Sequence, residues 1–419
     1  MEMAGSRKRV VRGRWLWTGE RLISRGGVVV EGDRVEALLD AGEPDPPHAS
    51  LVDLPDALLH PGLLDAHVHL DLSGLEGTIP RGLPFPQWLA RIRAHRQAVG
   101  SAGLERAIER GIAQLVASGT AKVIDFAYGA LSEAALLKSG LRAAVLRELI
   151  GLDSARLVET LREATVWLCS PSEASLVLRG LAPHSPYLAT AELITTSASL
   201  CRSRPFSIHL AEFLGETEFL ERGTGELADF LSDLGVGIGK FAPPGCGPIE
   251  ALELWGALEG TLAVHANVLD RSDIERLRAH RAAVVFCPRS HAYFARSPHP
   301  LPELLASGVP VALGTDSSAS CGPLSVAEEM REVRRQFPSV DARTVFALGT
   351  GALLPPSDRL PWSGVLAVGG AADFAAAAPS AAHRAETSDP LEAFLNEPAP
   401  CVLNVVAGQI LHGAPAADC

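Results

Sequence analysis

Short apolar runs alternate with amphipathic stretches along the middle of the chain, residues 62–354. Segments such as "GLERAIERGIAQLVASG" and "RSDIERLRAHR" carry apolar residues at helical spacing, which predicts helices with one buried face. The runs between them have the composition of buried strands, and there are eight: "LLHPGLLDAHVHL", "AKVIDFA", "LRAAVLREL", "SLVLRGLAPH", "PFSIHLAE", "TLAVHAN", "AAVVFCP" and "VPVALGTDS". Eight strands alternating with helices predict an α/β fold, a (β/α)8 TIM barrel, and a doubly wound sheet is the alternative.

The two ends of the chain follow a different pattern from this middle part. Residues 1–61 contain short β-type segments broken by Gly, Asp and Pro, such as "RVVRGRWLWTG" and "GGVVVEGDRVEALL". Residues 355–419 return to the same character in "SGVLAVGGAADFAAAAPS" and "PCVLNVVAGQILHG". We therefore expect residues 1–61 and 355–419 to form one small β-sandwich beside a barrel of residues 62–354.

The composition excludes several classes of protein. Hydrophobic residues make up 47% of the chain and charged residues 21%, which supports a large buried core and excludes a disordered chain. The net charge of -12 disfavours binding to nucleic acid, whose phosphates it would repel. No run reaches the ~18 apolar residues of a membrane span, and the first residues carry no apolar signal core. The seven cysteines are scattered without a C-x-x-C pair, which indicates free thiols and a cytoplasmic protein.

Side chains with metal-ligand chemistry fall where the predicted strands end, which is where barrel enzymes carry their active sites. His67 and His69 lie two residues apart at the end of the first strand, so both project to the same side. Later strands end at His209, His265 and Asp316. Several imidazoles with one carboxylate predict a site for one divalent metal ion, Zn²⁺ or Fe²⁺, with an open position for water.

Glu212 follows His209 by three residues in "HLAEFLGE". Just past the strand, its carboxylate can enter the same cavity and exchange a proton with a substrate beside the metal. The alternative is a glutamate at a helix start, stabilised there by the helix dipole. The neighbouring ligand His209 favours the catalytic interpretation.

These pieces, in this order, resemble the amidohydrolase superfamily. The matching motifs are "PGLLDAHVHL", "GLAPHSPY", "HLAE", "HAN", "CPRS" and "LGTDSSAS", with the closing segment "GVLAVGGAADF", and they run from about residue 8 to residue 411. The resemblance is to the branch of cytosine, adenosine and S-adenosylhomocysteine deaminases and triazine hydrolases. The loop "HLDLSGLEGTIPRGLPFPQWL" and the segment "CPRSHAYF" resemble aminodeoxyfutalosine deaminases, enzymes of the futalosine route to menaquinone.

The resemblance implies a role for each site residue. One divalent metal is bound by His67, His69, His209 and Asp316. Glu212 and His265 act on the substrate and the attacking water, and His184 lies in the substrate pocket. From the chemistry of the ligand set we also expect Asp316 to relay a water proton to the departing ammonia. Members with two metals use a carboxylated lysine or another ligand at the end of strand four. His184 stands there and the four lysines lie elsewhere, so a single metal is expected.

The function expected first is hydrolytic deamination of an adenine-type nucleoside such as aminodeoxyfutalosine, with release of ammonia. An amidase or a chlorohydrolase with the same metal site is the second possibility, and a metal-binding protein without catalysis, which Glu212 disfavours, is the third. A small molecule is the expected partner, without nucleic acid or membrane. Barrel enzymes often form homodimers, but no sequence feature locates an interface.

Four residues are candidates for contacts to the substrate. His184, His291 and Arg289 could recognise the edge of a heterocycle. Arg81, in the proline-rich loop after the first strand, or Arg289 could hold a substrate carboxylate through a bidentate contact. The alternatives are an ion pair for Arg289, a loop histidine for His291 and a solvated side chain for Arg81.

Overall fold

Two four-stranded parallel sheets form the centre of this computed structural model, which describes residues 8–152, 154–171, 176–233, 235, 241–379 and 389–413. One sheet has the order β6 (Leu63–Val68), β7 (Thr120–Ala127), β8 (Arg142–Leu149) and β9 (Val177–Pro183). The other has the order β10 (Ser207–Leu210), β11 (Leu262–His265), β12 (Ala283–Phe286) and β13 (Val311–Leu313). Seven of the eight apolar runs in the sequence contain one of these strands, and the eighth covers all of β7 except Thr120.

Two isolated β-bridges join the two four-stranded sheets, one at each pair of neighbouring sheet edges. Leu181 in β9 pairs with Phe206, just before β10, and Val68 in β6 pairs with Asp316, just after β13. The eight strands therefore follow one another around a closed ring, which a doubly wound open sheet does not form.

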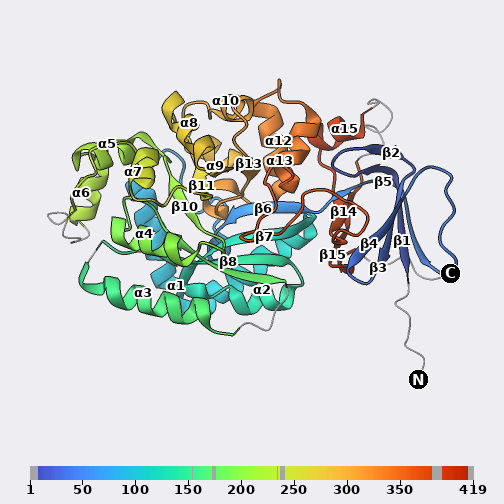
Figure 1. Cartoon of the computed structure of the whole chain (residues 1–419), viewed down its shortest axis with the longest axis horizontal. Helices are drawn as coiled ribbons and strands as arrows, with labels where there is room; N and C mark the ends of the chain where they lie inside the picture. Colours follow the sequence, from blue (N-terminus) through green and yellow to red (C-terminus); the bar gives the residue numbers. More distant parts are fainter. Residues whose placement is uncertain are drawn as a thin grey trace.

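Helices follow the strands of this ring, and most of them lie on its outer side (Figure 1). They are α1 (Phe85–Ala117, kinked at Gly100), α2 (Glu133–Ser139), α3 (Ser154–Cys169), α4 (Ala191–Leu200), α5 (Leu214–Arg222), α6 (Glu226–Asp233), α7 (Pro248–Leu254), α8 (Arg271–Ala279), α9 (Pro288–Tyr293), α10 (Leu301–Ala306), α11 (Ser318–Cys321), α12 (Val326–Gln336), α13 (Ala342–Thr350) and α15 (Pro390–Asn396). The two amphipathic stretches noted in the sequence lie in α1 and α8. Among the described residues, no helix combines the length and apolar character needed to cross a bilayer.

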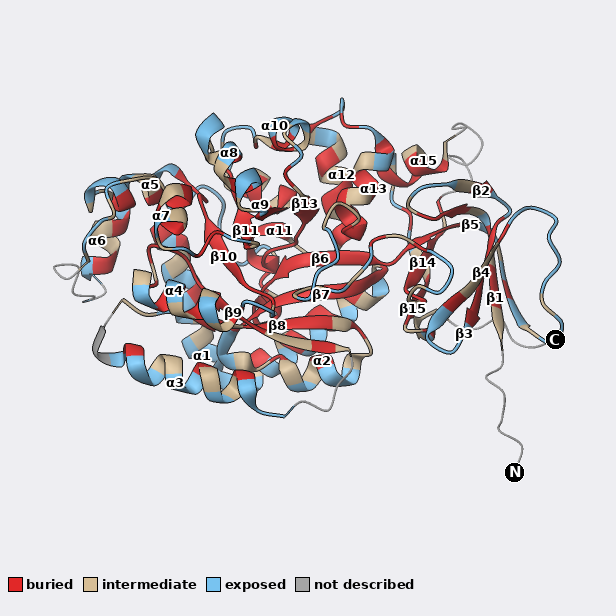
Figure 2. Cartoon of the chain, viewed as in Figure 1, coloured by how far each residue is buried: buried red, intermediate tan, exposed pale blue. Residues whose placement is uncertain are grey.

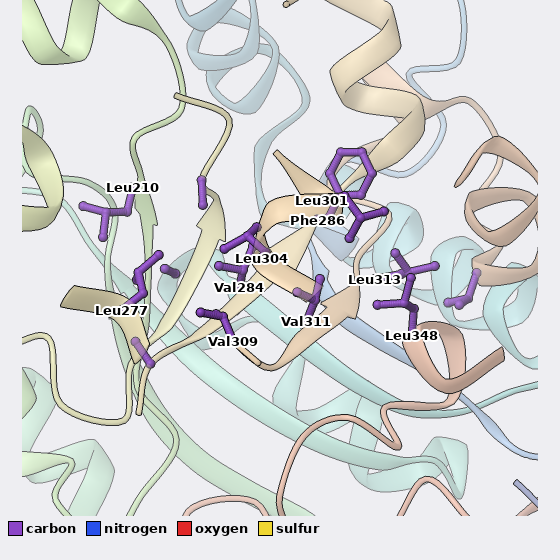
Figure 3. Close-up of a cluster of buried hydrophobic side chains, with 14 of the residues drawn as sticks. Leu210, Leu277, Val284, Phe286, Leu301, Leu304, Val309, Val311, Leu313 and Leu348 are labelled. Carbon is purple, nitrogen blue, oxygen red and sulfur yellow. The ribbon is translucent and has the colours of Figure 1, made fainter. Parts of the chain in front are cut away.

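The strands of the ring are buried on both faces, whereas the helices expose their outer side (Figure 2). In β12, Val284 and Phe286 pack against the surrounding helices, while Ala283 and Val285 face the interior of the ring. This alternation follows from the two-residue period of a strand. Figure 3 shows the layer between β10–β13 and the helices, filled by aliphatic side chains such as Leu304 of α10.

The strands from the two ends of the chain lie in one further sheet, as expected. Its order is β16 (Gln409–His412), β15 (Cys401–Val406), β14 (Phe374–Ala377), β5 (Ser50–Pro61), β1 (Arg9–Trp17), β3 (Gly27–Glu31) and β4 (Arg34–Leu39), and β2 (Leu22–Ser24) pairs with β1. The expected β-sandwich is thus, by hydrogen bonding, a single mixed sheet, because β14 inserts antiparallel beside β5 and joins the two ends directly. It packs around a core of its own that includes Val11, Val28, Phe374 and Val405. The division of the chain at residues 61 and 354 stays a prediction.

The connection from this sheet to the barrel requires a glycine. β5 ends at Pro61, β6 begins at Leu63, and Gly62 lies between them. A Cβ atom at Gly62 would approach the Cβ of Ala121 to 2.3 Å, so a larger residue would push β6 away from β7. Every cysteine that the structure describes is a free thiol, while Cys419 lies outside the described residues.

Candidate metal centre and active site

Five side chains converge where strands of the ring end. His67 lies on β6 and His69 just after it, His209 and His265 lie on β10 and β11, and Asp316 follows β13. The Nε2 atoms of His69 and His209 are 3.3 Å apart. Asp316 Oδ1 lies 3.5 Å from Nε2 of His67 and 3.9 Å from Nε2 of His69. These distances bring the predicted ligands, which come from both halves of the chain, to one buried point.

The donor atoms of this cluster fit one divalent metal ion. Two groups, His67 with His209 and His265, and His67 with His69 and Asp316, have ligand atoms within 4.8 Å of one another. Both ring nitrogens of His67 are buried without a hydrogen-bond partner among the described residues. Such unpaired buried atoms are costly, and a bound ion would satisfy Nε2. Imidazole and carboxylate donors are those that Zn²⁺ and Fe²⁺ accept.

Electrostatics also suit metal binding. Burial holds the pKa of His69 and of His209 well below the ordinary value, so both rings are neutral and can offer a lone pair. Burial alone would raise the pKa of Asp316, but its contact with His67 and the nearby His265 ring lower that pKa below the usual value. The aspartate is therefore ionised, as a metal ligand must be.

Hydrogen bonds behind the cluster orient its ligands. Nδ1 of His209 donates to the carbonyl oxygen of His184 at 2.7 Å, which leaves Nε2 directed at the cluster. The Oδ2 atom of Asp316 accepts from Ser290 at 2.6 Å and from Ser320 at 3.1 Å, which leaves Oδ1 for His67 and His69. These contacts set the tautomer of the histidine and the rotamer of the aspartate before any ion binds.

The backbone at the cluster is strained in the way that functional sites often are. His265 has a φ of 76° and Asp316 a φ of 62°, and Ala211 and Ala266 beside them also have positive φ values. Residues other than glycine rarely adopt this conformation, and the surrounding structure must hold them there. For Asp316 it does so through two backbone hydrogen bonds of 2.9 Å, from Asp316 N to His67 O and from His69 N to Asp316 O.

Glu212 lies against the cluster and is held on both carboxylate oxygens. Oε1 accepts from Nη2 of Arg296 at 3.0 Å, and Oε2 accepts from the hydroxyl of Tyr187 at 3.2 Å. Arg296 also donates to the main-chain oxygen of Glu212. Oε1 lies 3.8 Å from Nε2 of His265. The side chain makes no cap for α5, whose preceding residue is Phe213, so the helix-start alternative does not account for its position.

The protonation of Glu212 suits proton exchange at neutral pH. Burial raises the pKa of its carboxyl to about 7, and the positive charge of Arg296 opposes that rise. A group with such a pKa can both accept and release a proton near neutrality.

A cavity with an aromatic wall opens over the cluster. Its lining includes His69, His184, His209, Glu212, His265 and Asp316, together with Arg96, Glu148 and the apolar residues Leu72, Phe85, Trp88, Leu89, Ile92 and Phe294. We call it the metal cavity. A larger cavity of about 930 Å³, the outer cavity, adjoins it and shares Leu89, Ile92, Arg96 and His184 with it. A ligand of drug size fits such a volume.

Comparison with known proteins agrees with this geometry. The Amidohydrolase family profile matches residues 58–408, most of the chain. This protein belongs to the amidohydrolase family. It is 30% identical over 342 residues to an aminodeoxyfutalosine deaminase of Deinococcus radiodurans, covering 77% of this chain and 79% of that protein. It is 28% identical over 382 residues to a 5-methylthioadenosine/S-adenosylhomocysteine deaminase of Shouchella clausii, covering 87% and 83%.

Solved structures show the same fold. An adenosine deaminase from Xanthomonas campestris with bound zinc superimposes with a TM-score of 0.83 at 23% identity, covering 96% of this chain and 92% of that chain. An atrazine chlorohydrolase from Arthrobacter aurescens TC1 with zinc gives a TM-score of 0.81 at 19% identity, covering 98% and 97%. The superfamily assignment made from the motifs is confirmed, and the chain is an amidohydrolase acting on carbon–nitrogen bonds other than peptide bonds.

Of the four predicted substrate contacts, the structure places only His184 in this amidohydrolase's metal cavity. The main-chain N and Nε of Arg289 donate to the buried carboxylate of Glu329 at 2.8 and 2.6 Å. His291 donates through Nε2 to the carbonyl oxygen of Ser297 at 2.8 Å. Arg81 is exposed and lies over the ring of Tyr293. Among the described residues these three line neither the metal cavity nor the outer cavity, because two have protein partners and the third faces solvent.

Sequence reasoning missed several residues of the site. Tyr187 lies inside the quoted segment "GLAPHSPY", and Glu148 is the second-last residue of the predicted third strand, so the rule of strand ends could have found both. Arg96 carried no such signal. It lies on α1, where its guanidinium holds Asp71 at 2.7 and 3.1 Å and Glu148 at 3.3 Å. Arg296 reaches Glu212 from the loop after α9, which only the tertiary structure reveals.

Proposed function

We propose that this metal-dependent amidohydrolase is a hydrolytic deaminase of an adenine-type nucleoside. The observation that carries the proposal is the position of Glu212, buried and held beside the cluster in the cavity that also contains His184. Three relatives by sequence are named as deaminases of aminodeoxyfutalosine, 5-methylthioadenosine/S-adenosylhomocysteine and 5'-deoxyadenosine. Aminodeoxyfutalosine is our leading substrate, and it would place the enzyme in the futalosine route to menaquinone.

The chain's own residues can move the protons that such a reaction needs. A divalent ion, zinc or iron, held by His67, His69, His209 and Asp316 would lower the pKa of a water molecule towards neutrality. Glu212 would accept a proton from the attacking water and donate it to the ring nitrogen next to the amino-bearing carbon. His265 would donate a hydrogen bond to the oxygen that becomes negative during the attack. Asp316 would pass the second water proton to the leaving amino group, so one water and one amine become a carbonyl and ammonia.

The outer cavity provides room for a substrate larger than a base. Its wall contains the apolar residues Leu152, Leu157, Leu188 and Phe230, and also Arg93 and Arg156. An extension at the 5' position of the sugar could lie there while the base stays in the metal cavity. In this proposal Arg93 and Arg156 replace Arg81 and Arg289 as partners of a carboxylate on that extension, because of these four described arginines only Arg93 and Arg156 line the outer cavity.

A substrate panel tests the proposal. Ammonia release by the zinc-loaded protein would be measured with aminodeoxyfutalosine, S-adenosylhomocysteine, 5'-methylthioadenosine, adenosine, cytosine and a simple amide. We expect the adenine nucleosides to react, and Arg93→Ala and Arg156→Ala to reduce kcat/KM for the carboxylated substrates more than for adenosine. Arg106→Ala, an exposed arginine of α1, is the matched control. If no adenine compound releases ammonia, the deaminase proposal is wrong.

A hydrolase of triazines or amides is the second candidate. The likeness of the fold to an atrazine chlorohydrolase favours it, and the same metal cluster could serve it. Chloride release from atrazine, without ammonia release from any adenine nucleoside, would select this candidate over the deaminase.

A further inference from the structure

Glu148 at the end of β8 carries a buried carboxylate oxygen without a partner. Its side chain is 1% exposed. Oε2 accepts from Nη1 of Arg96 at 3.3 Å, whereas Oε1 has no hydrogen-bond partner among the described residues. A buried acceptor without a donor costs free energy, so such an atom in an enzyme cavity indicates a ligand that donates to it.

The position of Glu148 indicates which part of a bound ligand would lie next to its Oε1 atom. Glu148 lines the metal cavity, and it contacts two residues, Arg96 and His184, that line both cavities. Oε1 lies 3.9 Å from Nε2 of His184, which is too far for a hydrogen bond. Glu148 therefore stands at the junction of the metal cavity with the outer cavity.

Arg96 determines which oxygen of Glu148 is left without a hydrogen-bond donor. Its guanidinium is anchored by the carboxylate of Asp71, with bonds of 2.7 and 3.1 Å, and lies over the ring of Tyr128. From this fixed position it engages Oε2 of Glu148 and leaves Oε1 unengaged. Burial raises the pKa of the Glu148 carboxyl to about 7, and the positive charge of Arg96 opposes that rise, so the ionised form, which can only accept hydrogen bonds, is present at neutral pH.

We propose that Oε1 of Glu148 accepts a hydrogen bond from a sugar hydroxyl of the substrate, so that Glu148 selects nucleosides with an intact ribose diol. This inference rests on the proposed function. With the base in the metal cavity and a 5' extension in the outer cavity, the sugar lies at the junction between them. Its 2' and 3' hydroxyls are the donors available there, and a charged acceptor makes the strong form of such a bond.

A near-isosteric substitution tests the proposal. In Glu148→Gln the amide oxygen would face the donors of Arg96, so the amide NH2 group would take the place of Oε1 and remove the charged acceptor from the junction. We would measure kcat/KM of the zinc-loaded enzyme for adenosine and for 2',3'-dideoxyadenosine. Binding of both nucleosides would be measured by calorimetry on the same samples. The matched control is Glu163→Gln, which breaks an exposed pair with Arg147, the β8 residue before Glu148.

The expected result is a preference of wild type and Glu163→Gln for adenosine of about 10- to 100-fold, the usual effect of one hydrogen bond to a charged group. Glu148→Gln should reduce this preference to less than about 3-fold. The proposal is overturned if wild type does not distinguish the two nucleosides. It is also overturned if Glu148→Gln lowers kcat/KM for both nucleosides equally, since Glu148 would then only position Arg96 or His184.

The binding measurement separates this inference from the proposed function. If no nucleoside releases ammonia but wild type binds adenosine more tightly than the dideoxy compound, and Glu148→Gln does not, the diol site stands and the deaminase proposal fails. If ammonia is released without any such preference in rate or binding, the deaminase proposal stands and the diol site fails.

Discussion

Replacing Arg296 should remove most of the turnover of this enzyme through its effect on Glu212. The guanidinium donates to Oε1 of Glu212 at 3.0 Å and also to the main-chain oxygen of the same residue. Its plane lies against three aromatic rings, Phe294 at 4.9 Å, Phe85 at 5.4 Å and Phe213 at 5.7 Å. In Arg296→Gln the carboxylate would keep only the hydrogen bond from Tyr187.

The magnitude follows from these contacts. The side chains of Arg296 and Glu212 are 12% and 6% exposed, so the pair is buried, and removing one partner of a buried pair costs about 3 kcal/mol or more of stability. A displacement of the carboxylate by roughly 1 Å would lower kcat about 100-fold. KM should change little, because Arg296 is not among the residues that line the metal cavity in the described structure.

The pH profile should move as well. Burial raises the pKa of Glu212 to about 7, and the positive charge of Arg296 opposes this rise. Removal of Arg296 should therefore raise the pKa of Glu212 further. Below its pKa the carboxyl is protonated and cannot accept a proton from water. The acid limb of kcat/KM is therefore expected at higher pH in Arg296→Gln than in wild type, and closer to wild type in Arg296→Lys, which keeps the charge.

The assay combines ammonia release across pH with metal content and the melting temperature. Arg331→Gln is the control, since Arg331 also lies over an aromatic ring, Phe394 at 5.1 Å, and donates to carbonyl oxygens far from the site. It should lower the melting temperature without changing kcat. The reasoning is refuted if Arg296→Gln, with its metal bound, keeps kcat within about 3-fold of wild type and an unchanged acid limb, since the loss of a working general base costs at least about 100-fold.

Three further predictions concern the metal and the fold around it. Glu212→Gln should keep the metal and lose turnover by about 100-fold or more, because the amide preserves shape but cannot cycle a proton; wild-type kcat would contradict this role. Chelation of wild type, or the substitution His209→Ala, should remove both the metal and the activity. Added zinc should restore both in the chelated wild type but not in His209→Ala, as measured by elemental analysis and ammonia release. Gly314→Ala should lower the melting temperature and metal content, since its Cβ would lie 2.8 Å from the Cβ and 3.0 Å from the main-chain N of His67; a variant that melts and binds metal like wild type would contradict it.

The periodicity of the chain was sufficient to find the strands and to place the candidate metal ligands at their ends. All eight apolar runs form strands of the ring, and these strands are apolar because they are buried on both faces. Such a run can be recognised from its own residues, without knowing which strand it pairs with. His67, His69, His209, His265 and Asp316 could be located because each falls at the end of such a run. Their convergence follows from the closed ring, which brings the ends of parallel strands to one rim.

The substrate contacts could not be located in the same way. Arg81, Arg289 and His291 lie in loops after strands, but a loop can turn its side chains to several partners. Arg289 is paired with Glu329, a buried carboxylate of α12 that no sequence pattern connects with it. A position near the site in sequence therefore did not predict a position in the cavity.

What the sequence by itself determined is the set of strands, the order of the candidate metal ligands and the family, since these depend on residue type at short spacing. Only the tertiary structure decided which arginine pairs with which buried carboxylate. Arg96 and Arg296 reach Glu148 and Glu212 across 52 and 84 residues, from a helix and a loop whose direction is set by packing. It also decided that β14 joins β5 in one sheet, because strand pairing depends on edges left open by the rest of the fold. A long side chain or a free strand edge has many potential partners along the sequence, and only the packing of the folded chain decides which of them lies within reach.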